Sequence, residues 1–257
     1  LKVSEVKSLD RAEKKILTSD GETVGYDKLI LATGSVPYSP PVQGSEKKNI
    51  FLIRKEIPYL QGLMSTIDRI QDLVIVGGGF IGIEFASECR KKRGLNVSLV
   101  EVLPHCLMGS GLDEEFCVEV ERALSEIGVR IFTGRGVESF EGKTGVEKVK
   151  LTDGKELRTD AVLIAVGLKP EVRLAEKAGL ELGRTGGIKV DRYMRTSDPN
   201  IFACGDCVEK SSFFTGKPVK LMLASVGALE ARIAGANLFE IKPVSYTHLT
   251  LPTKRIV

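Results

Sequence analysis

Three glycines in this 257-residue chain, Gly77, Gly79 and Gly82, have the G-x-G-x-x-G spacing of a turn that binds the pyrophosphate of a dinucleotide. The chemistry is electrostatic, because a turn without side chains brings backbone N–H groups and a helix N-terminus close to the phosphate oxygens. We expect Gly77 to make the tight turn, Gly79 to allow the close approach, and Gly82 to let the helix pack on the sheet. An ordinary glycine-rich turn is the alternative, so the context of the motif decides.

The residues around the glycines supply the context that this chemistry requires. The apolar run 73–76 predicts a buried strand before the motif, and a helix is expected over residues 79–93. Glu101 follows the next expected strand, about 24 residues after Gly77 and close to the ~20 of known sites. A carboxylate there accepts hydrogen bonds from both hydroxyls of an adenosine ribose, although it could be a plain strand-end acid. It would repel a 2′-phosphate, so the sequence favours NADH over NADPH.

For other residues with reactive side chains, the sequence gives weaker evidence of a catalytic or binding role. Cys204 and Cys207 form a single C-x-x-C, which would suit a redox dithiol or half a metal site. Against both readings, there is no second pair, and a redox pair would normally open a helix beside a charge that activates the nucleophile. His105 and Cys106 are expected to be loop residues, and with two histidines in the chain we predict no metal site. Asp206 lies on a glycine-containing turn at a strand end, where it suits a cofactor hydroxyl or caps the turn.

The elements that must hold these residues alternate between strands and helices, which predicts an α/β fold with a Rossmann-like parallel sheet. An antiparallel meander is expected at 137–158, and the proline-rich segment 36–44 is expected to be a crossover loop or a domain boundary. Asp113 is expected to cap a helix that buries Phe116 and stops at Gly128. Other helices are expected at 56–65, 79–93, 174–178 and 224–239, and strands at 3–6, 14–17, 29–32, 50–53, 73–76, 97–100, 129–133, 160–166, 188–190 and 201–203.

The composition is that of an ordinary globular protein, with 42% hydrophobic and 28% charged residues. The net charge of +3 is spread along the chain, which gives no case for nucleic acid or a membrane surface as partner. No apolar run reaches the ~18 residues of a membrane span. Five cysteines without a framework of spacings suit a reducing compartment, so we expect a cytoplasmic protein.

Three separated segments occur in a fixed order: YDKLILATG at residues 26–34, VGGGFIGIE at 76–84 and IFACGD at 201–206. This set resembles the two-dinucleotide-binding flavoproteins of the pyridine nucleotide-disulfide oxidoreductase family. The resemblance covers about residues 1–240. It is specific, because no single coincidental motif produces all three segments in order.

The resemblance implies a role for each of these segments. The first would lie against FAD, the second would take NADH, and the aspartate of the third would hold the ribityl chain of FAD. Glu84 would lie near the nicotinamide, and Gly167 would line the same site at the end of a parallel strand. The implied cofactor-binding residues are Thr33, Gly34, Gly77, Gly79, Phe80, Ile81, Gly82, Glu84, Glu101, Gly167, Asp206 and Ala224, the last at the start of a helix that approaches the flavin.

The implied activity is hydride transfer from NADH to FAD, and from FAD to a cysteine-centred disulfide or sulfenate, or to oxygen. Residues 230–237 look most like NADH oxidases and coenzyme A-disulfide reductases. A low-molecular-weight disulfide or oxygen is therefore the expected substrate. An electron-transferase flavoprotein of the rubredoxin, ferredoxin or nitrite reductase type is a second reading. A non-catalytic NADH-binding module is a third, from a different class.

The chain also departs from the family pattern. By the family pattern, the first FAD fingerprint and the redox cysteine would precede Leu1, and the domain that makes the family's homodimers would follow the matched segment. We therefore expect no catalytic residue here, and an inactive fragment. Residues from Val244 onward resemble a translated sequencing adapter. The expected divisions are a partial FAD-binding domain (1–45), a crossover (46–71), an NADH-binding domain (72–190), a return segment of the FAD-binding domain (191–243) and a non-native tail (244–257).

Overall fold

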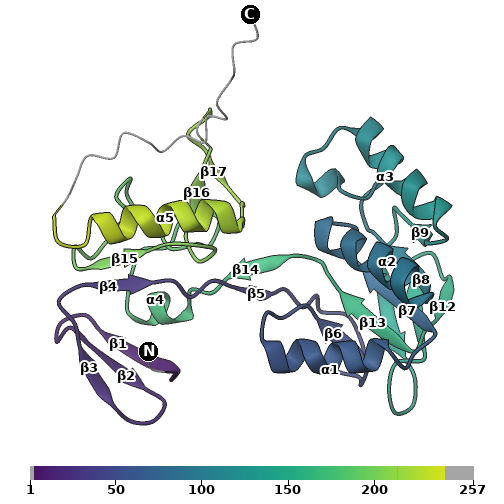
Figure 1. Cartoon of the computed structure of the whole chain (residues 1–257), viewed down its shortest axis with the longest axis horizontal. Helices are drawn as coiled ribbons and strands as arrows, with labels where there is room; N and C mark the ends of the chain where they lie inside the picture. Colours follow the sequence, from purple (N-terminus) through teal and green to yellow (C-terminus); the bar gives the residue numbers. More distant parts are fainter. Residues whose placement is uncertain (1–2, 213, 241–257) are drawn as a thin grey trace, which may run out of the picture. The chain divides into compact units, whose positions relative to one another are not determined.

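The computed structural model of the chain describes residues 3–212 and 214–240 (Figure 1). The chain divides into two compact units, residues 37–168 and residues 1–36 with 169–257. We call them the central unit and the flanking unit, and describe each by itself. The α/β class predicted from the sequence is confirmed. The tail expected at 244–257 lies outside the described residues.

A five-stranded parallel sheet forms the middle layer of the central unit, in the order β6-β13-β7-β8-β9. Its inner strands are apolar and buried along nearly their whole length, as is usual where both faces of a parallel sheet are covered. Since all the strands run in one direction, their carboxyl ends share one edge, where ligands bind in such sheets. The strands are β6 (Ile50–Leu52), β7 (Asp72–Val76), β8 (Asn96–Val100), β9 (Arg130–Phe132) and β13 (Ala161–Ile164).

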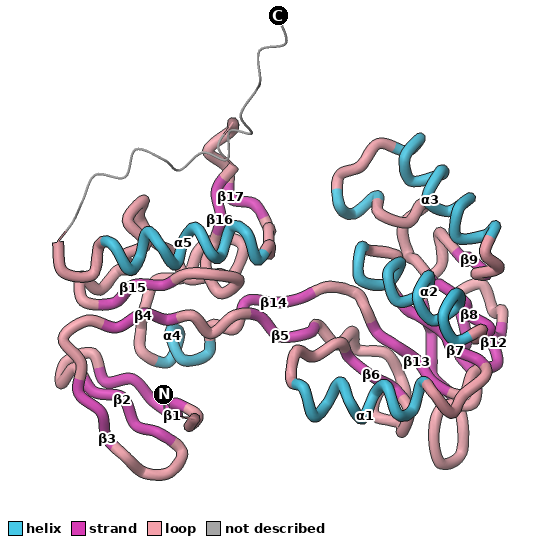
Figure 2. The backbone as a smooth tube through the Cα atoms, in the orientation of Figure 1, coloured by secondary structure: helices cyan, strands magenta, loops and turns pink. Residues whose placement is uncertain are grey.

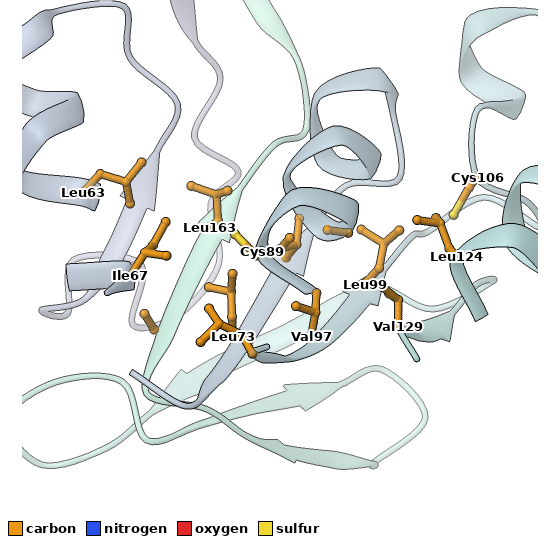
Figure 3. Packing of buried hydrophobic residues seen from close by; sticks show 14 residues of the cluster. Leu63, Ile67, Leu73, Cys89, Val97, Leu99, Cys106, Leu124, Val129 and Leu163 are labelled. Atoms are coloured by element: carbon orange, nitrogen blue, oxygen red, sulfur yellow. The ribbon is translucent and has the colours of Figure 1, made fainter. Parts of the chain in front are cut away.

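Three helices cover one face of this sheet, as Figure 2 shows. They are α1 (Ile57–Ile67), α2 (Phe80–Arg93) and α3 (Glu114–Glu126). Their apolar side chains, among them Leu63, Cys89 and Leu124, meet those of the sheet in one buried cluster (Figure 3). α2 ends at Gly94, whose left-handed backbone (φ 66°) is the helix stop that the sequence predicted.

An antiparallel meander covers the opposite face. It consists of β10 (Val137–Glu141), β11 (Lys148–Leu151) and β12 (Glu156–Arg158), which are adjacent in that order. Phe140 and Val149 of the meander pack against Val74 and Val162 of the sheet. Because neighbouring strand residues point to opposite faces, Leu73 and Leu163 belong instead to the cluster under the helices. The central unit therefore has three layers, and the meander is the insert that the sequence predicted.

The flanking unit combines a small antiparallel sheet with a two-stranded parallel sheet. Ala175, Leu180 and Ile188 are buried in its core against Leu9 and Leu31. Residues 169–190 thus pack here, whereas the sequence analysis placed them in the central domain. The elements are β1 (Val6–Asp10), β2 (Lys15–Thr18), β3 (Thr23–Gly25), the parallel pair β4 (Leu29–Leu31) and β15 (Ile201–Ala203), the hairpin β16 (Lys210–Ser211) and β17 (Pro218–Val219), and the helices α4 (Arg173–Lys177) and α5 (Ala224–Ala236).

Some local expectations were wrong. β5 (Ser35–Pro37) and β14 (Leu168–Pro170) are short strands that contain the points where the chain passes between units. The segment 36–44, expected to be a crossover loop or a domain boundary, thus begins at the division between units, but its first two residues belong to a strand and not to a loop. Pro37 is tolerated because it ends its strand. Phe116 is 64% exposed, since Cys117 takes the buried face of α3 instead. Residues 188–190 form no regular strand, only isolated bridges at Ile188.

Asp113 stands at the N-cap of α3, but its side chain makes no capping hydrogen bond. Among residues 3–212 and 214–240, none of the helices is long and apolar enough to cross a membrane.

Candidate functional site

The glycine loop between β7 and α2 is built so that side chains would not fit. Gly77 has a positive φ of 107°, and a Cβ there would lie 2.5 Å from the Ala165 carbonyl oxygen. A Cβ on Gly82 would collide with the carbonyl of Gly77, so Gly82 lets the helix close onto the loop itself. A Cβ on Gly78 would come within 2.7 Å of the Cys106 sulfur. The sequence analysis gave no role to Gly78, whose only signal was a third consecutive glycine.

Gly79 differs from the other three glycines because a Cβ there would meet no atom within 4 Å. It is the N-cap of α2 with an extended backbone, and the first-turn N–H groups of a helix have no partner within the helix. The first turn carries no acidic side chain, and the last turn carries four basic residues that complement the helix dipole. Gly79 thus offers open space in front of a helix N-terminus, which is the arrangement that binds phosphate.

Glu101 follows β8 at the same edge of the sheet, and its carboxylate is held on both oxygens. Oε2 accepts the backbone N–H of Gly78 at 2.6 Å, and Oε1 accepts that of Leu103 at 2.8 Å. A carboxylate accepts about four hydrogen bonds, so each oxygen retains capacity for one more. Two vicinal ribose hydroxyls match this remaining capacity. The position therefore fits the role that the sequence predicted for Glu101.

The loop after Glu101 is held by hydrogen bonds that its sequence did not predict. The N–H of Leu107 donates to the Gly78 carbonyl at 2.9 Å, and Leu107 itself has a left-handed backbone (φ 62°) that a leucine rarely adopts. The N–H of Cys106 donates to Glu121 Oε1 at 2.7 Å. Burial, followed by the nearby Glu121 carboxylate, raises the pKa of the Cys106 thiol to about 12. This thiol is therefore held protonated and is a poor nucleophile.

His105 has partners that the sequence did not reveal. Its Nδ1 lies 3.2 Å from Glu121 Oε2, and its Nε2 lies 3.4 Å from Glu114 Oε1. Both glutamates belong to α3, so their distance in sequence hid them. Across the described ranges, no group of three or more His, Cys, Asp and Glu side chains could hold a metal ion.

The remaining predicted residues of the central unit lie near the same edge. Phe80 is 58% exposed at the start of α2, and Ile81 beside it is also exposed. Glu84 is exposed too, and it is the fifth residue of α2, in the second turn of the helix. Gly167 follows β13 with a positive φ of 105°, and its carbonyl accepts the N–H of Tyr38 at 3.0 Å.

In the flanking unit, the two predicted turns come together. β4 and β15 are parallel, with Leu31 opposite Ala203, so the turns that follow them share one edge. The Thr33 hydroxyl donates to the Glu171 carbonyl at 2.5 Å, and the Ser35 hydroxyl donates to Asp206 Oδ2 at 2.8 Å. Gly34 and Gly205 both have positive φ, as such turns require. Ala224 is exposed as the first residue of α5, and a Cβ on Gly227 of that helix would lie 3.3 Å from Gly205.

A buried ion pair beneath the Gly205 turn was not predicted. Lys210 and Glu230 are joined at 2.9 Å with side chains 7% and 9% exposed. Glu230 also accepts the N–H of Gly205 at 2.9 Å, and Lys210 donates to the Gly205 carbonyl at 2.6 Å. The pair thus holds both polar groups of the residue before Asp206. A lysine and a glutamate 20 residues apart gave no signal in the sequence.

The C-x-x-C beside this turn is buried. Cys204 and Cys207 are buried free thiols, and Cys207 Sγ donates to the Cys204 carbonyl at 3.2 Å. Burial raises the pKa of the Cys204 thiol, with the nearby Cys207 as the next cause. A desolvated, protonated thiol is inert.

Comparison with known proteins identifies relatives of the whole chain. The profile of the family described as pyridine nucleotide-disulphide oxidoreductase matches residues 1–231. An NADH oxidase of Methanocaldococcus jannaschii is 33% identical over 94% of this chain and 54% of its own length. A rubredoxin-NAD(+) reductase of Alcanivorax borkumensis is 35% identical over 94% of this chain and 60% of its own.

Among solved structures, an NAD-dependent persulfide reductase from A. fulgidus superposes with a TM-score of 0.88 at 34% identity. The match covers 94% of this chain and 45% of that one. The chain therefore spans about half the length of the relatives it matches.

Proposed function

The chain belongs to the pyridine nucleotide-disulphide oxidoreductase family, and from that premise we propose that its central unit binds NADH as the electron donor of an FAD-dependent oxidoreductase. The observation that carries the proposal is the pairing of an open helix N-terminus at Gly79 with the Glu101 carboxylate at one sheet edge. The first suits a pyrophosphate and the second suits an adenosine ribose. The family likeness alone would not carry a function, because one fold hosts many activities.

Each residue of the site would have a defined task. Backbone N–H groups at Gly79 and in the first turn of α2 would hold the pyrophosphate without a competing acidic side chain. The two remaining acceptor sites of Glu101 would bind the ribose hydroxyls, and its charge would disfavour the 2′-phosphate of NADPH. Phe80 and Ile81 would cover the dinucleotide, while Glu84 and Gly167 would lie toward its nicotinamide end.

The flanking unit would contribute to the FAD site. Asp206, Thr33 and Gly34 lie at one edge of β4 and β15, where a carboxylate and an exposed turn suit the ribityl chain and ring. The described residues fit that side of FAD but include no second glycine turn for its pyrophosphate. The flavin would supply the electron transfer from NADH, and the protein would orient the two cofactors and exclude water.

We propose that any thiol chemistry takes place outside the described residues. All five cysteines of the chain are buried and free, and the pKa values of Cys89, Cys106, Cys117 and Cys204 are raised, chiefly by burial. The whole protein would therefore pass electrons to a disulfide or sulfenate through a cysteine elsewhere, or to oxygen directly. Its homodimer through a C-terminal domain, its place in the cytoplasm and the inactivity of this chain by itself belong to the same proposal.

An electron-transferase reductase remains the second candidate. The similarity to a rubredoxin-NAD(+) reductase supports it, because that relative is named for electron transfer involving the protein rubredoxin. The two candidates share the NADH site and differ only in the final acceptor. A non-catalytic NADH-binding module would also share this site.

The direct test is calorimetric titration of the 257-residue chain with NADH, NADPH and ADP-ribose. We expect NADH and ADP-ribose to bind with similar affinity, because the adenosine and pyrophosphate carry the predicted contacts, and NADPH to bind more weakly. Absence of NADH binding, with the central unit folded by circular dichroism, would contradict the proposal. To separate enzyme from module, flavin reduction by NADH is measured in the full-length protein, and a protein that binds NADH but never reduces flavin supports the module.

A further inference from the structure

Glu121 of α3 holds the loop that places the Glu101 carboxylate, although it lies outside the expected dinucleotide motif. Its two oxygens are divided between adjacent loop residues: Oε1 accepts the N–H of Cys106 at 2.7 Å, and Oε2 faces His105 Nδ1 at 3.2 Å. The Glu121 side chain is 19% exposed, so these contacts are shielded from water. Hydrogen bonds to an ionised carboxylate are stronger than neutral ones.

The held loop in turn encloses the peptide groups of Gly78. The Leu107 N–H donates to the Gly78 carbonyl at 2.9 Å, and Glu101 Oε2 accepts the Gly78 N–H at 2.6 Å. The sulfur of Cys106 fills the space where a Gly78 side chain would be. Both polar groups of Gly78 are thus fixed by the two ends of one loop.

The backbone of Leu107 shows that this loop conformation is imposed. A leucine with a φ of 62° has a strained backbone, and such a residue persists only where its surroundings over-determine it. Leu107 is also buried. Glu121 supplies the constraint from outside the loop, because it binds the residue directly before Leu107.

We propose that Glu121 is a positioning residue for nucleotide recognition: by binding His105 and Cys106, it fixes the loop that holds Glu101 in the one orientation that receives a ribose. The inference rests on the proposed NADH site. Without Glu121, the loop would release Gly78, and the Glu101 carboxylate would sample other orientations. Affinity for NADH would fall, and so would the discrimination against NADPH, because both depend on where that carboxylate lies.

The test compares Glu121→Ala, Glu121→Gln and the control Glu119→Ala in the full chain. Glu119 lies on the same helix, but it pairs with Arg122 in solvent. We expect Glu121→Ala to raise the Kd for NADH about tenfold while changing that for NADPH much less. Glu121→Gln, whose amide oxygen can still accept the Cys106 N–H, should recover most of the affinity, and Glu119→Ala should match the wild type.

Two outcomes would overturn the inference. One is wild-type NADH binding by Glu121→Ala. The other is an equal loss of NADH and NADPH affinity, which would indicate general loosening instead of a displaced carboxylate. Hydrogen exchange gives a readout without ligand: the amides of Gly78, Cys106 and Leu107 should exchange faster in Glu121→Ala, while those of β13 stay unchanged. If the wild type binds no NADH, the proposed function fails and the positioning role fails with it.

Discussion

The central and flanking units each hold a glycine turn in place, but they do so with different interactions. Each has a glycine turn after a parallel strand, and in each a glutamate accepts the glycine N–H, Glu101 at Gly78 and Glu230 at Gly205. At Gly78 the carbonyl is bound by a backbone N–H, whereas at Gly205 it is bound by the buried ammonium of Lys210. The central unit therefore relies on main-chain geometry, and the flanking unit relies on a buried charge pair.

The sheets behind the two turns account for this difference. The central turn stands on a five-stranded sheet covered on both faces, so the ends of its strands are fixed by their neighbours. The flanking turn stands on β4 and β15, which form a two-stranded parallel sheet. Two strands by themselves are marginally stable. In the flanking unit, where the sheet supports the turn less, the salt bridge between Lys210 of β16 and Glu230 of α5 holds the turn instead. The turn is therefore sensitive to the loss of either charge.

The largest effect should come from breaking that charge pair. Lys210→Met leaves the Glu230 carboxylate buried without its cation, which should cost roughly 3–5 kcal/mol of unfolding free energy in the flanking unit. Urea unfolding combined with hydrogen exchange at the β15 amides would measure the loss. The control Lys189→Met removes an exposed pair with Glu181 and should cost less than about 1 kcal/mol.

The double variant Lys210→Met with Glu230→Leu separates the effect of an unpaired buried charge from the effect of lost packing. Replacing both charges by apolar groups should restore most of the stability, because the buried unpaired charge is gone. A double variant as unstable as Lys210→Met would contradict the role of charge and point to packing instead.

The next effect concerns nucleotide choice in the central unit. Glu101→Arg replaces a carboxylate that repels a 2′-phosphate with a cation that attracts it, so the preference for NADH should narrow or reverse by about tenfold or more. Titration with both nucleotides checks this. Equal affinity of the unchanged chain for NADH and NADPH would remove Glu101 from the ribose site.

At the opposite edge of the central sheet, the Asp160 carboxylate also accepts backbone N–H groups, so it measures how much such bonds contribute to stability. Asp160 Oδ2 accepts the N–H groups of Asp72 and Gln71, both at 2.9 Å, and these bonds lower the pKa of Asp160 in the folded state. A lowered folded pKa adds stability above the unfolded value of about 3.9, and that stability is lost as the pH falls through the folded value. Asp160→Asn should therefore cost roughly 1–2 kcal/mol at pH 7 and progressively less below pH ~4.

Urea unfolding at several pH values measures the Asp160 effect. Asp68→Asn is a suitable control, because Asp68 pairs with Arg93 at a more exposed position. A cost for Asp160→Asn that does not change with pH would show that the carboxylate contributes by shape and not by charge.

The smallest expected effect is a gain in stability. Ser98 is fully buried in β8, and within the described part of the chain its hydroxyl has no hydrogen-bond partner. Ser98→Ala should leave stability unchanged or raise it by up to about 1 kcal/mol, since no bond is lost. Thr159 is the contrasting control, because its hydroxyl donates to the Ala161 carbonyl at 2.6 Å and Thr159→Val should destabilise. A clear loss in Ser98→Ala would imply a partner for this hydroxyl.

The local sequence pattern predicted most strands and helices of the central unit, including the strand and the helix on either side of the glycine motif. β7, β8 and β13 are short apolar runs with turn residues beside them, and α2 follows from periodicity and the stop at Gly94. Residues 169–190 were misplaced because an apolar segment does not reveal which core it enters. The glutamate partners of His105 and the Lys210–Glu230 pair were missed for the same reason, because each contact joins residues whose spacing in sequence periodicity does not record.

The burial of all five cysteines has a practical consequence for measuring motion. A cysteine introduced on the surface would be the one readily accessible thiol, so dyes could be attached at chosen points without first removing native residues. One dye on exposed Lys189 of the flanking unit and another on exposed Glu119 of the central unit would report the distances between the units in solution. Energy transfer recorded with and without nucleotide would then show whether binding at Gly79 changes the arrangement of the units.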